Sequence, residues 1–200
     1  MYKHVDQTWR DRPQFMADET VGALARRLSD YVKEAGLTSV TVLLHGGEPL
    51  LAGAARLRRF LETIHGALAG SGCVVEFSMQ TNGVLLTEEL LELFDRWNVT
   101  FGISLDGDED ANDRWRKDHG GGSSHSRVIQ AIKLVADTTT GRRLFRGLLT
   151  VIDVRNDPLK TFNFLKDLAP PRLDFLFPDG TRDNPPPLPS LAKPGRHTVC

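Results

Sequence analysis

The sequence of 200 residues suffices for one domain of ordinary size, and its 40% hydrophobic and 26% charged residues exclude a chain that is disordered throughout. Lysine and arginine total 25 against 26 acidic residues, a net charge of -1, which argues against a generally basic nucleic-acid binder. The two cysteines, Cys73 and Cys200, are too few for a disulfide scaffold or an all-cysteine metal site. No apolar run approaches the roughly 20 residues that span a membrane, and no signal peptide opens the chain, so we expect a cytoplasmic protein.

Apolar runs rich in branched side chains alternate with segments of helical periodicity along the chain. This alternation predicts helices over 18–35, 54–70, 87–98, 126–137 and 158–168, and strands over 39–44, 73–79, 99–105, 146–152 and 172–177. Asp18 and Thr87 are predicted N-caps, and Gly36 is predicted to end the first helix. The polar, glycine-rich stretch from Asp106 to about His125 is predicted to be a loop.

Five strands that alternate with helices indicate an α/β fold with a parallel sheet. The pattern fits either an open doubly wound sheet or part of a (β/α) barrel, and in both architectures ligands bind at the loops that follow the strands. We expect one domain over residues 1–178 and a proline-rich, extended or disordered tail over 179–200.

The loop after the first predicted strand reads His45-Gly46-Gly47-Glu48-Pro49. The two glycines allow a ligand to approach the backbone closely, and the Glu48 carboxylate suits an ammonium group. The alternative is a tight turn that leads into a helix. Polar groups also follow the next two strands, which favours a shared ligand-binding rim over three unrelated turns.

Gln80 follows the second predicted strand and opens a Gln-Thr-Asn-Gly segment, in which Asn-Gly alone is a strong turn signal. Ser104 and Asp106 stand at alternate positions around the end of the third strand, so both could bind a ribose hydroxyl from one side. Arg116 in the next loop could reach a carboxylate or a phosphate. Taken singly, each of these residues is more often structural.

Other kinds of site lack their sequence patterns. The acidic loop from Asp106 to Asp110 fails the calcium-loop test, because Ala111 stands where a glycine is required. The six histidines show no metal-ligand spacing, so no residue is assigned to a metal. An ordinary α/β phosphate or sugar enzyme has neither a phosphate loop nor a general acid–base pair to support it.

Together, the motifs HGGEPLL, SMQTNG and GISLDG, with Arg116 twelve residues after Ser104, resemble the radical S-adenosylmethionine (SAM) enzymes. More narrowly they resemble SPASM-type peptide and protein maturases, which include the anaerobic sulfatase-maturating enzymes, and the opening HVDQTWRDRPQFM is similar to the FxsB-like branch. The resemblance implies a partial parallel (β/α)6 barrel and a 4Fe-4S cluster that cleaves SAM to a 5′-deoxyadenosyl radical. It also implies a peptide or protein substrate, while the charge balance and the lack of a long apolar run argue against nucleic acid or a membrane as a partner.

The resemblance assigns a set of positions to SAM binding: Gly46, Gly47, Glu48, Pro49, Gln80, Ser104, Asp106, Arg116 and Leu149. The first four match the motif that contacts the methionine amino group of SAM. Ser104 and Arg116 match residues that engage the ribose and the methionyl carboxylate, and Leu149 lies on a strand that packs against adenine. Gln80 matches a polar residue near SAM and the peptide, whereas Asp106 shares the motif of Ser104 without a specified role.

The sequence departs from the family pattern at the cluster. The CxxxCxxC loop that follows the first strand in the family is absent from this sequence, as is the cysteine-rich SPASM region, so we expect the first strand to be missing as well. We interpret the chain as a truncated gene product or gene model, which predicts in-frame cysteine codons upstream of Met1. We then expect a radical SAM protein fragment that is inactive alone, the alternative being a catalytically inactive SAM- or nucleotide-binding protein.

Overall fold

The computed structural model describes residues 11–117, 120–178 and 180, and its centre is a parallel sheet with the strand order β1-β2-β3-β4-β5. The strands are β1 (Ser39–Leu44), β2 (Val74–Thr81), β3 (Thr100–Ser104), β4 (Phe145–Val151) and β5 (Leu173–Leu176). Every neighbouring pair is parallel, so the chain crosses back along the sheet after each strand. The predicted α/β fold with a parallel sheet is confirmed.

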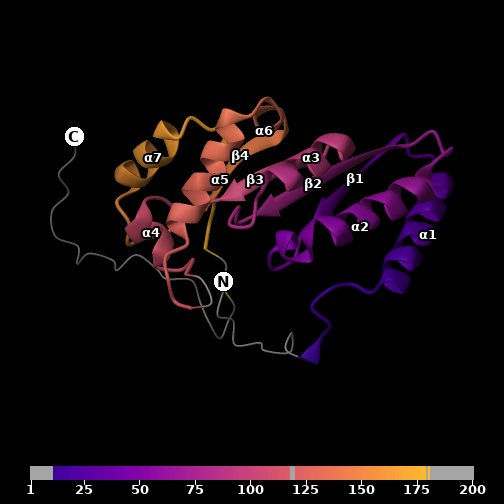
Figure 1. Cartoon of the computed structure of the whole chain (residues 1–200), viewed down its shortest axis with the longest axis horizontal. Helices are drawn as coiled ribbons and strands as arrows, with labels where there is room; N and C mark the ends of the chain where they lie inside the picture. The colour runs from indigo at the N-terminus through magenta and orange to yellow at the C-terminus, as the bar shows by residue number, and fades with distance from the viewer. Residues whose placement is uncertain (1–10, 118–119, 179, 181–200) are drawn as a thin grey trace, which may run out of the picture.

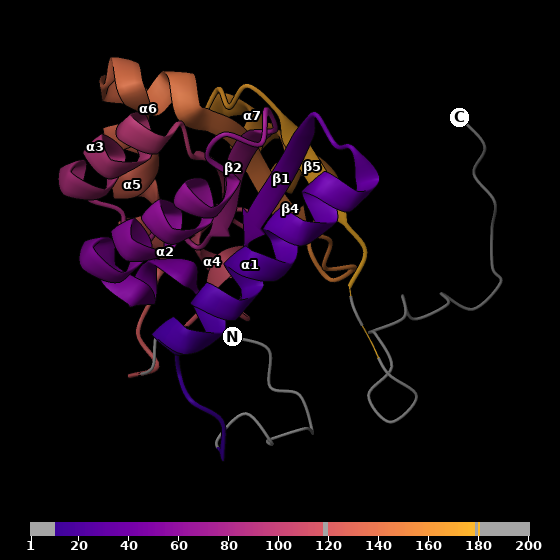
Figure 2. The same ribbon diagram turned by 90° about the vertical axis from the view of Figure 1, so that its right-hand side faces the viewer.

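The helices are α1 (Asp18–Ala35), the 3-10 helix η2 (Pro49–Ala52), α2 (Gly53–Leu68), α3 (Glu88–Trp97), α4 (Glu109–Asp113), α5 (His125–Asp137), α6 (Thr139–Leu144) and α7 (Pro158–Asp167). Figure 1 shows them along the sheet, and in the view turned by 90° α2, α3 and α5 lie to one side of the strands (Figure 2). The residues of β1 likewise alternate between the side of the sheet that the helices cover and the other side. Val40 and Val42 pack against the core, whereas Thr41 and Leu43 are exposed.

The hydrophobic core lies between the sheet and the helices. Strand residues at every second position meet helical residues three and four apart, because each element turns one apolar face inward. Ile64, Phe94 and Phe101 are fully buried. The ring centroids of Phe94 and Phe101 are 5.8 Å apart, and those of Phe101 and Phe145 are 5.9 Å apart. These aromatic contacts join α3 to β3 and β4, two of the strands that carry predicted site residues.

The other face of the sheet is more polar. Along β2 its alternate positions are Glu76, Ser78 and Gln80, none of which is fully buried. A linear strand order is the order found in a (β/α) barrel, whereas a doubly wound sheet reverses its order at a switch point. The described strands form an arc of such a barrel and do not close it, because β1 and β5 have one strand neighbour each.

Local sequence signals account for several helix boundaries. Thr87 accepts a hydrogen bond from the backbone N–H of Leu90 at 3.3 Å, so the predicted N-cap of α3 is confirmed. Gly36 ends α1 with a left-handed φ of 61°. The prediction for Asp18 is wrong: it is the first residue of α1, and the N-cap Ala17 makes no side-chain bond. The Asp18 charge acts there through the positive end of the helix instead of through a capping bond.

Other boundaries differ from the predicted ones. The predicted loop after Asp106 contains α4, which Asp108 caps, and a further short helix, α6, is capped by Thr138. Both helices are shorter than the window in which helical periodicity becomes visible. Strand β2 continues two residues beyond its predicted end, so Gln80 and Thr81 belong to the strand and not to the turn.

The predicted tail over 179–200 lies outside the described residues apart from Gly180, and so does the beginning of the HVDQTWRDRPQFM segment. Among the helices of the described part of the chain, none has the length and apolar character needed to cross a membrane.

Candidate functional site

The carboxyl ends of the parallel strands meet at one edge of the sheet, and the loops with the predicted site residues begin there. After β1, Gly46 and Gly47 are exposed, and a Cβ atom added to either would have nothing within 4 Å. Gly46 has a φ of 147°, which residues with a side chain rarely adopt. Among the described residues, the space in which a side chain of Gly46 or Gly47 would begin is therefore open.

The carboxylate of Glu48 joins this loop to the end of β2. Its Oε1 accepts the backbone N–H of Leu50 at 2.9 Å and the hydroxyl of Thr81 at 2.7 Å, and its Oε2 accepts the N–H of Asn82 at 2.7 Å. The bond to Leu50 caps η2, in which Pro49 is the first residue. A carboxylate has about four acceptor positions, and the described residues occupy three of those of the half-buried Glu48.

Gln80 and Ser104 form one polar unit across β2 and β3. The Nε2 of Gln80 donates to the Oγ of Ser104 at 3.0 Å. A Cβ atom added to Gly102 would lie 2.4 Å from the Oε1 of Gln80, so the glycine lets this amide lie across β3. Ser104 accepts this bond, and a serine hydroxyl can donate a bond while it accepts another.

Asp106 and Arg116 form a bidentate ion pair. The Nε of Arg116 lies 2.6 Å from Oδ2 of Asp106, and Nη2 lies 3.1 Å from Oδ1. The same Oδ1 accepts the backbone N–H of Val151 at 2.9 Å, which ties the pair to the end of β4. Protein donors thus engage both oxygens of Asp106, which is 5% exposed.

A second ion cluster lies next to Arg116 in the chain. Asp153, in the loop after β4, accepts two bonds from the guanidinium of Arg155 at 2.8 and 2.6 Å and one from Nε1 of Trp115 at 3.0 Å. The Arg155 bonds hold the pKa of Asp153 at about 2, although burial acts to raise it. Arg155 also stacks 4.8 Å from the Trp115 ring centroid. The cluster anchors the segment that carries Arg116.

The more polar face of the sheet has a hollow of about 290 Å³ over β3 and β4. Gly102 and Gly147 are register partners on these strands, so backbone forms its floor. Gln80 and Leu149 line the hollow, and Leu149 is the register partner of Ser104. Several residues of the lining are not among the predicted site residues: His45, Gly102, Arg146, Gly147, Arg172 and Asp174. Two-residue periodicity is the signal for Gly102, which precedes Ser104 by two positions and so faces the same side.

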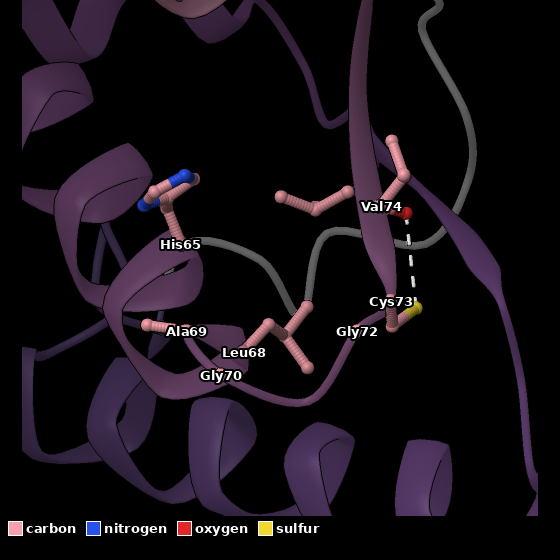
Figure 3. Close-up of a pocket in the computed structure, with 8 residues that line it drawn as sticks. His65, Leu68, Ala69, Gly70, Gly72, Cys73 and Val74 are labelled. Carbon is pink, nitrogen blue, oxygen red and sulfur yellow. Dashed lines mark hydrogen bonds between the residues drawn. The ribbon is translucent and has the colours of Figure 1, made fainter.

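A larger hollow of about 590 Å³ lies at the opposite edge of the sheet, between the end of α2 and the start of β2 (Figure 3). His65 and Cys73 both line it. The sulfur of Cys73 lies 3.7 Å from the carbonyl oxygen of Val74 and points away from His65 (Figure 3). The two side chains therefore do not form a nucleophile–base pair.

The described residues do not fit a 4Fe-4S cluster. Cysteine thiolates hold such clusters, and the sequence contains Cys73 and Cys200 only. Cys73 precedes β2 at the edge opposite to the strand carboxyl ends, and Cys200 lies outside the described residues. No group of three or more His, Cys, Asp or Glu side chains in the described part could hold a metal ion.

The structure thus brings Gln80 to Ser104 and Asp106 to Arg116. Between described residues, no hydrogen bond links Glu48 to either pair. The loops and strand ends at this edge supply a carboxylate after β1, a hydroxyl at the end of β3 and a guanidinium that pairs with Asp106 after β3. Such a set can bind a molecule that carries an ammonium, a hydroxyl and a carboxylate group.

Comparison with known proteins places this chain among radical SAM sequences. The family model described as the radical SAM superfamily matches residues 2–164. The serine-type anaerobic sulfatase-maturating enzyme of Bacteroides thetaiotaomicron is 28% identical over 162 residues, which are 80% of this chain and 37% of that protein. The serine-type enzyme of Klebsiella aerogenes is 34% identical over 101 residues, 50% of this chain and 25% of that protein. The chain therefore spans well under half the length of these relatives.

Solved structures agree on the fold. Native anSMEcpe with bound AdoMet and a bound peptide aligns with a TM-score of 0.73 at 22% identity, covering 84% of this chain and 45% of that one. Native anSMEcpe with bound AdoMet also aligns with a TM-score of 0.73, over 86% of this chain and 47% of that one. The expected radical SAM type of fold is thereby confirmed.

Proposed function

This chain belongs to the radical SAM superfamily, and on that premise we propose that it binds SAM at the carboxyl edge of its sheet and serves the SAM-dependent radical modification of a peptide or protein. The relatives named above are sulfatase-maturating enzymes, and one solved neighbour carries AdoMet and a peptide. Because the chain covers less than half the length of each of these proteins, the activity and the substrate class both belong to the proposal.

The observation that carries the proposal is the match between the polar groups at this edge and the groups of SAM. The open backbone of Gly46 and Gly47, with the remaining acceptor position of Glu48, suits the ammonium of the methionyl moiety. The hydroxyl proton of Ser104 suits a ribose oxygen. The guanidinium of Arg116 suits the methionyl carboxylate.

The remaining predicted residues have supporting roles in this proposal. Gln80 holds Ser104 from the neighbouring strand and lies on the face where a peptide would approach. Leu149 and the glycine floor offer a flat, partly apolar surface to the adenine. Pro49 stiffens the exit from the glycine loop, because its ring restricts the backbone at the start of η2.

A second candidate function is the binding of SAM or a nucleotide without catalysis, which is favoured because the two cysteines of the sequence are too few to hold a 4Fe-4S cluster. The two candidate functions differ in whether SAM is cleaved. Because the residues present do not fit a 4Fe-4S cluster, we expect the chain supplied with iron, sulfide and a reductant to form no 5′-deoxyadenosine from SAM, and formation of that product would instead support radical chemistry by this chain. SAM binding without that product supports the binding protein.

Calorimetric titration of the chain with SAM tests the proposed site. We expect Arg116→Ala to raise the Kd for SAM about tenfold or more and Ser104→Ala to raise it several-fold, because a hydrogen bond to a charged group is the stronger of the two. Arg143→Ala is the matched control, since Arg143 pairs with Asp95 across α6 and α3, away from the strand ends. Unchanged affinity in both site variants would contradict the proposed site.

A further inference from the structure

Arg116 is held through its backbone as well as through its side chain. Asp106 holds the guanidinium at Nε and Nη2. The backbone N–H of Arg116 donates to the carbonyl of Asn112 at 2.9 Å, and its own carbonyl accepts from the Oγ of Ser124. Asn112, which is fully buried, donates to the same Ser124 hydroxyl at 3.2 Å. These contacts fix the position and the direction of the arginine.

Asp106 is in turn fixed by the strands. Its Oδ1 accepts the N–H of Val151, so the carboxylate bridges the ends of β3 and β4. The side chain of Asp106 is 7% exposed and that of Arg116 is 20% exposed. Water therefore competes little for this pair, in contrast to ion pairs at the surface.

The pairing determines which part of the guanidinium a ligand can use. A guanidinium has five N–H donors, and Asp106 takes Nε–H and one of the two protons of Nη2. The other Nη2 proton and the adjacent Nη1 proton form a second fork, which matches the spacing of carboxylate oxygens.

We propose that Asp106 is a positioning residue that holds Arg116 so that its Nη1–Nη2 edge binds the ligand carboxylate, which makes the site selective for SAM over analogues without a carboxylate. The inference rests on the SAM binding proposed above and deepens it. In this arrangement Asp106 does not touch the ligand; it acts through Arg116.

Asp106 has opposing effects on carboxylate binding, and their balance can be measured. Its negative charge offsets that of Arg116, so on the basis of charge alone Asp106→Asn strengthens the attraction for an anionic group. Its hydrogen bonds also hold the guanidinium in one orientation, and their loss adds an ordering cost to binding. A positioning role therefore predicts weaker carboxylate binding in the variant, and a purely electrostatic role predicts tighter binding.

The test compares SAM with decarboxylated SAM, which retains the amine, the sulfonium and the nucleoside. We expect the wild-type chain to prefer SAM. Asp106→Asn should raise the Kd for SAM about tenfold and change the Kd for decarboxylated SAM less than about twofold. Arg116→Ala should abolish the preference, and adding Asp106→Asn to it should cause no further loss, because the two residues act as one unit.

Two further variants complete the experiment. Asp95→Asn removes a carboxylate from the Arg143 pair and should change neither Kd. Ser124→Ala removes the bond to the backbone carbonyl of Arg116 and the acceptor of the Asn112 amide, and leaves the Asp106–Arg116 ion pair in place. It should cause a smaller loss that is again selective for SAM, so it serves as the test if Asp106→Asn does not fold by circular dichroism. Unchanged or tighter SAM binding in the folded Asp106→Asn variant, or equal losses for both ligands, would overturn the inference alone. A wild-type chain that binds neither ligand would overturn the proposed function and this inference together.

Discussion

Gly102 and Gly147, which line the hollow on the more polar face of the sheet, have different surroundings. A Cβ atom on Gly102 would meet the amide oxygen of Gln80, the far end of a flexible side chain. A Cβ atom on Gly147 would lie 2.2 Å from the backbone carbonyl oxygen of Arg172, and Gly147 has a φ of 136°. The first clash is relieved by rotating one side chain, whereas the second requires the backbone of β4 or β5 to move.

We therefore expect the two alanine substitutions to affect different quantities. Gly102→Ala should displace Gln80 from Ser104 and raise the Kd for SAM about fivefold, while the free energy of unfolding changes by less than about 1 kcal/mol. Gly147→Ala should lower the free energy of unfolding by about 2–4 kcal/mol through clash and backbone strain. Urea unfolding and calorimetry measure both effects. A Gly147→Ala variant as stable as the wild type would contradict the geometry.

At the scale of secondary-structure elements, Asp153 connects the loop after β4 to the segment that follows α4. Its side chain is 6% exposed, while that of its partner Arg155 is 43% exposed. The carboxylate also accepts the backbone N–H of Arg155 at 3.0 Å and the indole N–H of Trp115 at 3.0 Å. One buried carboxylate thus orders two loops at the edge of the candidate site.

This connection predicts a pH-dependent stability. The pKa of Asp153 is lowered from 3.8 to about 2, so folding favours its ionised form. Its contribution is complete above about pH 5 and is lost as the pH falls towards 2. Asp153→Asn should lower the free energy of unfolding by about 1–2 kcal/mol at pH 7, a value reduced for the exposure of Arg155.

Urea unfolding of both proteins between pH 7 and pH 2.5 measures the effect, and the difference between them should narrow below about pH 4. Asp167→Asn is a suitable control, because Asp167 is exposed at the end of α7 and lies 4.0 Å from Lys166. A difference that stays constant across this range would show that the ionisation of Asp153 does not stabilise the fold.

At the scale of the whole molecule, the two edges of the sheet have different roles. The proposed SAM site lies at the carboxyl edge, and Cys73 lies at the other. Gln80 comes seven positions after Cys73 along extended chain. At about 3.3 Å per position, the two residues are roughly 23 Å apart. A change at Cys73 should therefore not reach the site.

Cys73→Ser tests this separation, and we expect the Kd for SAM to stay within about twofold of the wild-type value. Because Cys73 is half-buried, a small loss of stability is compatible with that result. Calorimetry of the variant, with Gln80→Ala as the comparison at the carboxyl edge, measures the difference. A tenfold loss of SAM affinity in Cys73→Ser would contradict the separation.

The sequence by itself determined the strand–helix alternation and the strand-end loops, because two- and 3.6-residue periods and Gly or Thr boundary signals are local properties. It also identified Gln80, Ser104 and Arg116 as candidates, since each lies in or near the loop after a strand. It missed α4 and α6, whose single turns are too short to show a period.

Only the tertiary structure decided which of these groups meet. Gln80 reaches Ser104 across 24 residues of sequence, through the register of β2 with β3 and the absence of a side chain at Gly102. Asp106 likewise meets Arg116, ten residues later, and the backbone N–H of Val151 at the end of β4. Both bonds depend on where the segment after β3 and the end of β4 lie in the fold. Hydrogen-bond partners distant in the chain are set by strand register and packing, and neither leaves a periodic signal in the sequence.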